Sequence, residues 1–148
     1  MGSLTLPLAG PVYADAQVFI YSVEKHPVYA AIVRPLWEAV SRGEIDVVTS
    51  ELTLMETLVG PLKRGDAALA EDYERFLASP GIRLAPLTAP ILRAAAGLRA
   101  TMTSLRTPDA LHAATANAAG CSLLITNDNG FRRLSNPVII FLDDLRDA

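Results

Sequence analysis

The chain has 148 residues, of which 51% are hydrophobic and 20% are charged, and its formal net charge is -3. This length and composition predict one compact domain over residues 1–148 and argue against a disordered or fibrous chain. A negatively charged chain has no general attraction for nucleic acid, so a nucleic-acid role would have to depend on a local site. The single cysteine, Cys121, excludes an internal disulfide and a zinc site built from several thiolates.

The sequence has no segment typical of a membrane protein or of an exported one. No apolar run approaches the roughly 20 residues that a membrane-spanning helix needs. Residues 1–24 contain no Lys or Arg, and Pro7, Gly10 and Pro11 interrupt their apolar character, which is untypical of a secretory signal. We therefore expect a cytoplasmic protein that makes no membrane contact.

Short apolar runs alternate with amphipathic stretches along the whole chain. From the amino end, the apolar runs predict strands at Val12–Ala14, Ile45–Thr49, Ile82–Leu87, Cys121–Thr126 and Val138–Leu142. The intervening stretches predict helices at Ala16–Lys25, Pro27–Gly43, Ser50–Gly65, Asp66–Leu77, Thr88–Leu105 and Pro108–Gly120. This alternation predicts a three-layer α/β/α sandwich around a mostly parallel sheet.

Three aspartates lie at the ends of these elements. Asp15 follows the first strand and Asp128 follows the run that ends at Thr126. Asp109 lies in the first turn of a helix whose expected N-cap is Thr107. If the strands before Asp15 and Asp128 run parallel and side by side, both carboxylates emerge at the edge of the sheet where ligands usually bind.

Glu56 is the fourth notable carboxylate, because it interrupts the apolar run Leu54–Val59. A buried and unpaired carboxylate is energetically costly, so Glu56 needs either a partner or a function. The aspartates also have ordinary alternatives: Asp15 as a helix cap, Asp109 as a partner of the helix dipole, and Asp128 as part of an Asn-Asp-Asn-Gly turn.

Taken together, the four carboxylates favour a metal site. They can all stay ionised near one another only around a positive charge. A hard divalent cation such as Mg²⁺ or Mn²⁺, held by oxygen ligands and water, suits such donors, and its usual use is phosphoryl-oxygen chemistry.

The motifs that carry these residues resemble those of PIN domains, in the same order along the chain. They are VYAD at 12–15, Glu56 within its helix, TPDAL at 107–111, and ITND at 125–128 followed by Phe131. The closest resemblance is to the VapC-type toxins of bacterial toxin–antitoxin pairs, and it extends from about Val12 to Leu142. It implies a PIN-like fold and a metal-dependent endoribonuclease.

The resemblance also implies roles for individual residues. Asp15, Glu56, Asp109 and Asp128 would form the acidic cluster. The aspartates would hold Mg²⁺ or Mn²⁺, Asp109 either directly or through water, and Glu56 would hold a water molecule. The expected reaction is hydrolysis of RNA that leaves a 5′-phosphate and a 3′-hydroxyl. The expected partners are a cognate antitoxin, with candidate contacts at Tyr21, Val28, Ile32 and Trp37, and a second copy in a homodimer.

Residues around the cluster are expected to support it. Polar neighbours that could assist the cluster are Gln17, Thr126, Asn127 and Asn129. Arg132 and Arg133 follow Asp128 closely and are candidate RNA contacts, although such pairs are usually only solvated. His112 is expected either to be solvated or to lie behind the site.

One departure from the family pattern keeps a second function open. The family commonly has Thr or Ser and then Asn after the first aspartate, whereas this chain has Ala16 and Gln17. The missing hydroxyl motivates the alternative of a catalytically weak or silent module that keeps the fold and the partner contacts. A receiver domain or an aspartate-based phosphatase is disfavoured, because no lysine follows Lys63 and no carboxylate lies two residues after Asp15.

Overall fold

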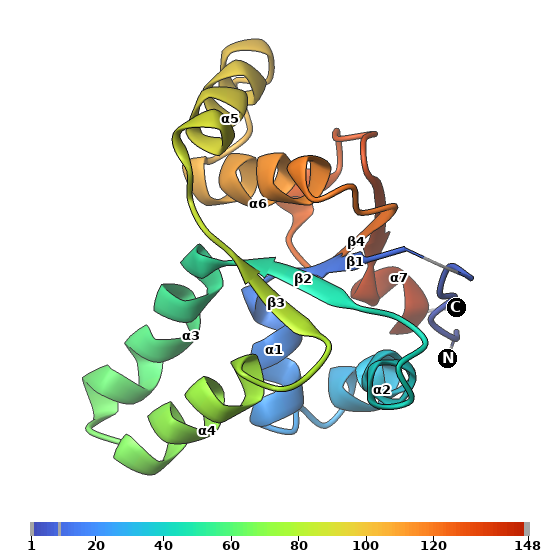
Figure 1. The fold of residues 1–148 in the computed structure, drawn as a ribbon, viewed down its shortest axis with the longest axis vertical. Helices are drawn as coiled ribbons and strands as arrows, with labels where there is room; N and C mark the ends of the chain where they lie inside the picture. Colours follow the sequence, from blue (N-terminus) through green and yellow to red (C-terminus); the bar gives the residue numbers. More distant parts are fainter. Residues whose placement is uncertain (1, 9, 147–148) are drawn as a thin grey trace.

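The protein is described by a computed structural model that covers residues 2–8 and 10–146. Five strands form one sheet in the order β3-β2-β1-β4-β5, and every neighbouring pair is parallel (Figure 1). They are β1 (Val12–Ala14), β2 (Val47–Ser50), β3 (Ile82–Ala85), β4 (Leu123–Thr126) and β5 (Val138–Phe141). The predicted α/β sandwich with a parallel sheet is confirmed.

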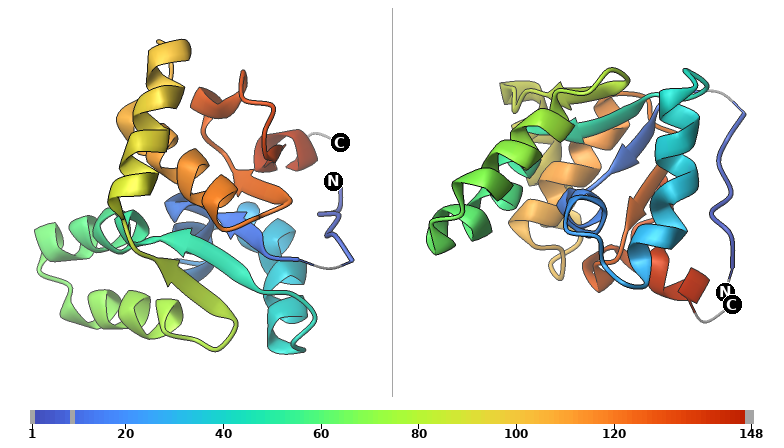
Figure 2. Two further views of the ribbon diagram at one scale, coloured as in Figure 1. Left: turned by 45° about the horizontal axis from the view of Figure 1, so that its top comes forward. Right: turned by 90° about the horizontal axis from the view of Figure 1, so that it is seen from below.

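Helices cover both faces of this sheet (Figures 1 and 2). In the described chain they are α1 (Ala16–Val23), α2 (Tyr29–Ser41), α3 (Glu51–Arg64), α4 (Ala67–Leu77), α5 (Ala89–Thr101), α6 (Thr107–Ala118) and α7 (Leu142–Arg146), with a 3-10 turn, η1, at Asn129–Phe131. In Figure 1, α5 and α6 lie on one side of the sheet and α1 to α4 on the other.

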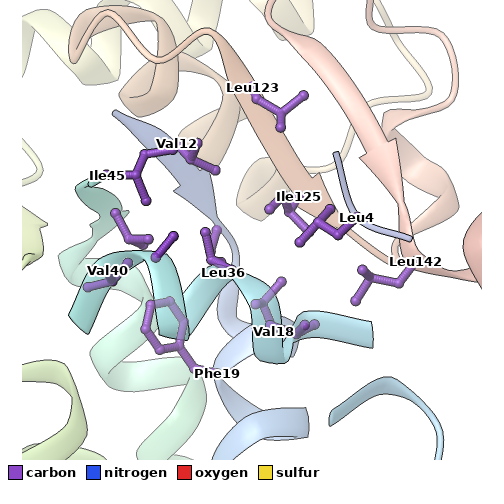
Figure 3. Packing of buried hydrophobic residues seen from close by; sticks show 14 of the residues in the cluster. Leu4, Val12, Val18, Phe19, Leu36, Val40, Ile45, Leu123, Ile125 and Leu142 are labelled. Carbon is purple, nitrogen blue, oxygen red and sulfur yellow. The ribbon is translucent and has the colours of Figure 1, made fainter. Parts of the chain in front are cut away.

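The alternation of side chains along β1 explains the three layers. Val12 and Ala14 point into one hydrophobic cluster, and Tyr13 points into another on the opposite face. The first cluster packs the sheet against α1 and α2 (Figure 3). The second packs it against α6 through Ala113 and Ala116. Because both faces are covered, the strands are mostly apolar, and β2 and β4 carry hydroxyl residues only at their carboxyl ends.

The strand order fixes where a ligand site can form. From β1 the chain moves outward through β2 to β3, and then returns to place β4 on the other side of β1. The order therefore reverses between β1 and β4, where Ala14 pairs with Ile125. In open α/β sheets, ligands bind at such a reversal, beyond the carboxyl ends of the strands. Asp15 follows β1 at this point, and Asp128 lies two residues beyond β4.

Capping residues explain several helix limits, and two expectations need correction. Ser50 caps α3 by accepting a hydrogen bond from the backbone N–H of Leu52 at 3.0 Å. Gly65 ends α3 in the left-handed conformation that glycine tolerates, with φ 67°. The second helix begins at Tyr29 and not at Pro27. Thr107 is the first residue of α6 and not its N-cap, because the N-cap position belongs to Arg106.

The two ends of the described chain lie side by side. The backbone N–H of Gly2 donates to the carbonyl oxygen of Leu145 at 2.6 Å, and Leu4 is buried in the same cluster as Leu142 (Figure 3). Within residues 2–8 and 10–146, no helix combines the length and the apolar character needed to cross a membrane.

Candidate functional site

Four elements bring the predicted carboxylates to the strand-order reversal. Asp15 occupies the N-cap position of α1, and Asp128 occupies that of η1. Asp109 lies in the first turn of α6, and Glu56 lies in the middle of α3. Asp109 and Asp128 share the guanidinium of Arg106, and we call them the Asp109–Asp128 pair. Asp15 and Glu56 do not bond each other, but the charge of Glu56 helps to raise the pKa of Asp15, and we call them the Asp15–Glu56 pair.

Asp15 is a buried carboxylate with one oxygen left without a partner. The residue is 5% exposed, and its Oδ2 accepts a hydrogen bond from the hydroxyl of Thr126. Its Oδ1 is buried and makes no hydrogen bond of normal geometry with the described residues. Burial raises the pKa of Asp15 to about 6, although nearby His112, the Thr126 bond and the backbone N–H of Val18 all lower it. Such a carboxylate is stabilised by any cation that reaches its free oxygen.

Thr126 joins the two pairs. Its hydroxyl oxygen donates to Asp15 and accepts a hydrogen bond from the backbone N–H of Asp128 at 3.0 Å. Thr126 is fully buried at the end of β4, so this position is fixed by the sheet. The hydroxyl therefore sets the place of Asp15 relative to the backbone of Asp128.

Glu56 is oriented by a chain of buried hydrogen bonds. The hydroxyl of Tyr13 accepts from the backbone N–H of Ser50 at 3.0 Å and lies 2.5 Å from Nδ1 of His112. Burial raises the pKa of Tyr13 well above its ordinary value, so the hydroxyl keeps its proton. The other ring nitrogen, Nε2, faces Oε1 of Glu56 at 2.7 Å and carries the hydrogen, because a carboxylate oxygen accepts.

The Asp109–Asp128 pair closes around Gly130 and Arg106. Oδ1 of Asp128 accepts from the backbone N–H of Gly130 at 2.8 Å. A Cβ atom on Gly130 would lie 2.5 Å from Oδ2 of Asp109 and 3.1 Å from Oδ1 of Asp128, so a larger residue here would push the Asp109 carboxylate aside. Burial raises the pKa of Asp109, which Arg106 lowers and the neighbouring charge of Asp128 raises.

Arg106 provides the positive charge of this pair. Its Nε lies 3.2 Å from Oδ2 of Asp109, and its Nη2 lies 3.4 Å from Oδ1 of the same residue. Nη2 also donates to Oδ2 of Asp128. One guanidinium thus neutralises much of the charge of two carboxylates.

The donors of this site fit a hard divalent cation in chemistry. Carboxylate oxygens are the ligands that Mg²⁺ and Mn²⁺ prefer, and the unpartnered Oδ1 of Asp15 is a buried oxygen in need of a positive neighbour. Within residues 2–8 and 10–146, however, no three His, Cys, Asp or Glu side chains already converge closely enough to hold an ion. An ion shared by both pairs therefore requires side-chain movement.

The sequence matches the family model described as "PIN domain" over residues 12–137. This range contains β1 and the four carboxylates of the site. The chain belongs to the PIN domain family. No curated protein sequence matches this PIN domain.

Several solved structures have the same fold, and chains of VapBC complexes are among them. One is a chain of VapBC2 from Rickettsia felis bound to a promoter DNA fragment, with TM-score 0.70, 18% identity, and coverage of 89% of this PIN domain chain and 98% of that chain. Another belongs to DNA-bound VapBC from Salmonella typhimurium, with TM-score 0.70, 18% identity, and coverage of 90% and 99%. A third belongs to FitAcB from Neisseria gonorrhoeae, with TM-score 0.67, 17% identity, and coverage of 90% and 99%. At these identities the likeness shows the fold.

The other predicted site residues lie at varying depths around this edge. Oε1 of Gln17 is buried without a hydrogen-bond partner among the described residues. Asn127 donates to the hydroxyl of Tyr21 at 3.2 Å and accepts from the backbone N–H of Asp143 at 2.9 Å, so it ties α1 to α7. Asn129 is exposed and accepts from Nε of Arg132 at 3.2 Å.

The two arginines predicted to contact RNA differ from each other. Arg132 forms two bonds to Asp144, at 2.8 Å and 2.9 Å, and lies 3.7 Å above the ring centre of Phe141. Arg133 is exposed on the surface. Neither belongs to the two carboxylate pairs.

Sequence reasoning missed Arg106 and Tyr13 and left His112 undecided. His112 is 3% exposed, which excludes the solvated alternative and places the ring behind Glu56. Arg106 had a usable signal, because a residue three positions before Asp109 can reach it at a helix start. Tyr13 had none, because its contact with His112 spans 99 positions in the chain.

Proposed function

We propose that this protein is a Mg²⁺- or Mn²⁺-dependent endoribonuclease and the VapC-type toxin of a toxin–antitoxin pair. Its place in the PIN domain family supports a nuclease. Its likeness to chains of VapBC complexes supports an antitoxin partner. The observation that carries the proposal is that three aspartates are connected at the strand-order reversal, Asp15 to Asp128 through Thr126 and Asp109 to Asp128 through Arg106.

The three aspartates are the residues that would hold the ion. Asp15 offers its unpartnered Oδ1, and Asp109 and Asp128 offer oxygens that now contact Arg106. When bound, such an ion neutralises charge on phosphate oxygens and activates water for attack on phosphorus. Thr126 keeps Asp15 and the backbone of Asp128 in register with each other.

Glu56 is suited to orient the attacking water. The hydrogen bond from His112 fixes the direction of the carboxylate through Oε1, while 29% of the side chain remains exposed. The group can therefore accept a hydrogen bond from water. Tyr13 and His112 act as positioning residues, because they reach the water only through Glu56.

The antitoxin would use an apolar surface near the early helices. A cavity of about 570 Å³ is lined by Trp37 and Phe76, whose ring centres lie 5.0 Å apart. Trp37, Tyr21 and Val28 are partly buried, which leaves part of each side chain for a partner. The expected contact at Ile32 is wrong, because Ile32 is only 3% exposed within the core.

The second copy of a homodimer would use the outer side of α3. Three large apolar side chains are exposed along this helix, and their exposed fractions are 62% for Met55, 49% for Val59 and 67% for Leu62. They lie within two turns of each other on one helix, so they form a continuous apolar stripe.

Cleavage of RNA by purified protein tests the proposal. We expect cleavage with Mg²⁺ or Mn²⁺, loss of cleavage with a chelator, and a fall on the order of 100-fold or more in Asp15→Asn or Asp109→Asn. Asp72→Asn is the matched control, because it removes one carboxylate from the exposed surface of α4. Its rate should equal that of the wild type.

Two outcomes would reject the proposal. Cleavage that survives both substitutions would place the activity elsewhere or in a contaminant. A folded wild type that neither cleaves RNA nor binds the ions at millimolar concentration would favour the silent module suggested by Ala16 and Gln17.

A further inference from the structure

The guanidinium of Arg106 occupies the space between two of the carboxylates assigned to the metal. It contacts both oxygens of Asp109 and Oδ2 of Asp128. Each carboxylate oxygen keeps a second lone pair, but a guanidinium in contact with both carboxylates repels a divalent cation that approaches the same oxygens. Arg106 therefore stands where part of the first coordination shell of an ion would form.

The backbone of Arg106 is firmly held on both sides. Arg99, from α5, donates through Nε to the carbonyl oxygen of Leu105 at 3.1 Å and through Nη1 to the hydroxyl of Thr107 at 2.9 Å. Leu105 is 1% exposed in the cluster between α5 and α6. The carbonyl oxygen of Arg106 accepts from the backbone N–H of Ala110 at 3.0 Å. The Cα atom of Arg106 is thus fixed beside the site.

The side chain of Arg106 is free to move, in contrast to its backbone. It is 65% exposed, so it can leave the carboxylates and remain hydrated. Ion pairs with such exposure are weak and exchange easily for water. Asp109 is only 3% exposed in its side chain, and its neighbour Asp128 repels it, so a cation beside this carboxylate stabilises its ionised form.

We propose that Arg106 is a built-in counter-cation that holds Asp109 and Asp128 together in the metal-free protein and is displaced when a divalent cation binds. This inference rests on the proposed metal site. The arginine keeps the pair assembled, and it competes with the ion for the same oxygens. Removal of its charge should therefore strengthen metal binding and weaken the metal-free fold.

Titration of Mn²⁺ by calorimetry tests this competition without any measurement of activity. At low ionic strength, Arg106→Gln should bind Mn²⁺ roughly two- to tenfold more tightly than the wild type, the range expected for loss of exposed ion pairs. Arg75→Gln is the matched control. Arg75 is also exposed and also contacts two carboxylates, Glu71 and Asp72, but it lies on α4 away from the site. Its affinity for Mn²⁺ should stay at the wild-type value.

Thermal unfolding with and without Mn²⁺ is a second test, because an arginine with only a structural role would give a difference in unfolding temperature that does not depend on Mn²⁺. With a chelator present, Arg106→Gln should unfold at a lower temperature than the wild type. With saturating Mn²⁺ the difference should shrink or reverse, because the ion replaces the lost charge. If Arg106→Gln does not fold, Arg106→Lys serves instead. A lysine ammonium cannot bridge both carboxylates as the forked guanidinium does, so the Arg106→Lys protein should bind Mn²⁺ more tightly than the wild type.

Two results would overturn the inference, and they are distinct. Equal or weaker Mn²⁺ affinity in Arg106→Gln, with clear binding by the wild type, refutes the competition and leaves the metal site intact. Absence of Mn²⁺ binding at millimolar concentration in the wild type and in all variants refutes the inference together with the metal site.

Discussion

The Asp15–Glu56 pair and the Asp109–Asp128 pair meet at one sheet edge but are held by different forces. Buried donors hold the first: the hydroxyl of Thr126 bonds Asp15, and the ring of His112 bonds Glu56. A single charged and largely exposed side chain, Arg106, holds the second. The positions of Asp15 and Glu56 thus depend on buried side chains of the core, whereas those of Asp109 and Asp128 depend on the mobile side chain of Arg106.

This difference teaches how such a site can be stable before any ligand arrives. Hydrogen bonds from neutral groups fix the direction of a carboxylate without removing its charge, so Asp15 stays costly to ionise. An arginine removes the charge but has to be displaced before the oxygens can be used. In the metal-free protein, the carboxylates of the first pair are therefore already oriented, whereas those of the second are already neutralised.

The largest expected effect concerns the ionisation of Asp15. Its pKa is about 6 in the folded protein, against 3.8 for an ordinary aspartate side chain, so the folded state binds more protons between these values. The contribution of Asp15 to the free energy of unfolding of the metal-free protein should fall by about 2 kcal/mol as the pH rises from about 4 to about 7. Asp15→Asn should lack this fall, and chemical denaturation over that pH range measures it.

The matched control for this experiment is Asp72→Asn, which removes an exposed carboxylate. It should keep the pH profile of the wild type. Added Mn²⁺ should stabilise the wild type at pH 7 and leave Asp15→Asn nearly unchanged. Parallel profiles for the wild type and Asp15→Asn would mean that burial of Asp15 does not raise its pKa in the folded protein.

A smaller effect is expected from Tyr13→Phe, which removes the hydroxyl behind His112. The backbone N–H of Ser50 and Nδ1 of His112 lose their partner, at a cost of about 1–3 kcal/mol in the free energy of unfolding. RNA cleavage should fall roughly tenfold, because Glu56 loses its fixed direction.

Tyr73→Phe is the control that separates stability from positioning. Tyr73 is equally buried, and its hydroxyl donates to Glu24, away from the four carboxylates. It should lose stability and retain cleavage. If Tyr13→Phe cleaves RNA as fast as Tyr73→Phe, the chain from Tyr13 to Glu56 has no role in the reaction.

The sequence predicted the parts of the site that depend on local pattern. Asp15 and Asp128 follow short apolar runs, so the ends of β1 and β4 could be recognised, and parallel neighbouring strands place both at one edge. Ser50 and Gly65 marked the limits of α3 by their capping chemistry. The bounds of β1 were also predicted correctly, whereas several other strand and helix ends were displaced by a few residues, because packing decides where the last turn or pair forms.

The parts that depend on distant contacts could not be predicted. Tyr13 resembles an ordinary strand residue, and its hydrogen bond to His112 can be recognised only in the folded structure, where β1 lies against α6. His112 falls on a helix face that an isolated pattern cannot distinguish from a solvated one. Arg106 was overlooked because Thr107 and Pro108 resemble a helix start, whereas the N-cap position belongs to the arginine before them.

The most direct test of the proposed metal site is a crystal soaked in millimolar Mn²⁺ and measured for anomalous scattering at the manganese edge. We expect a strong peak bonded to at least two of Asp15, Asp109 and Asp128, with the guanidinium of Arg106 withdrawn from Asp109. A well-ordered structure with no peak at these carboxylates, and with Arg106 still between Asp109 and Asp128, would contradict the proposed site.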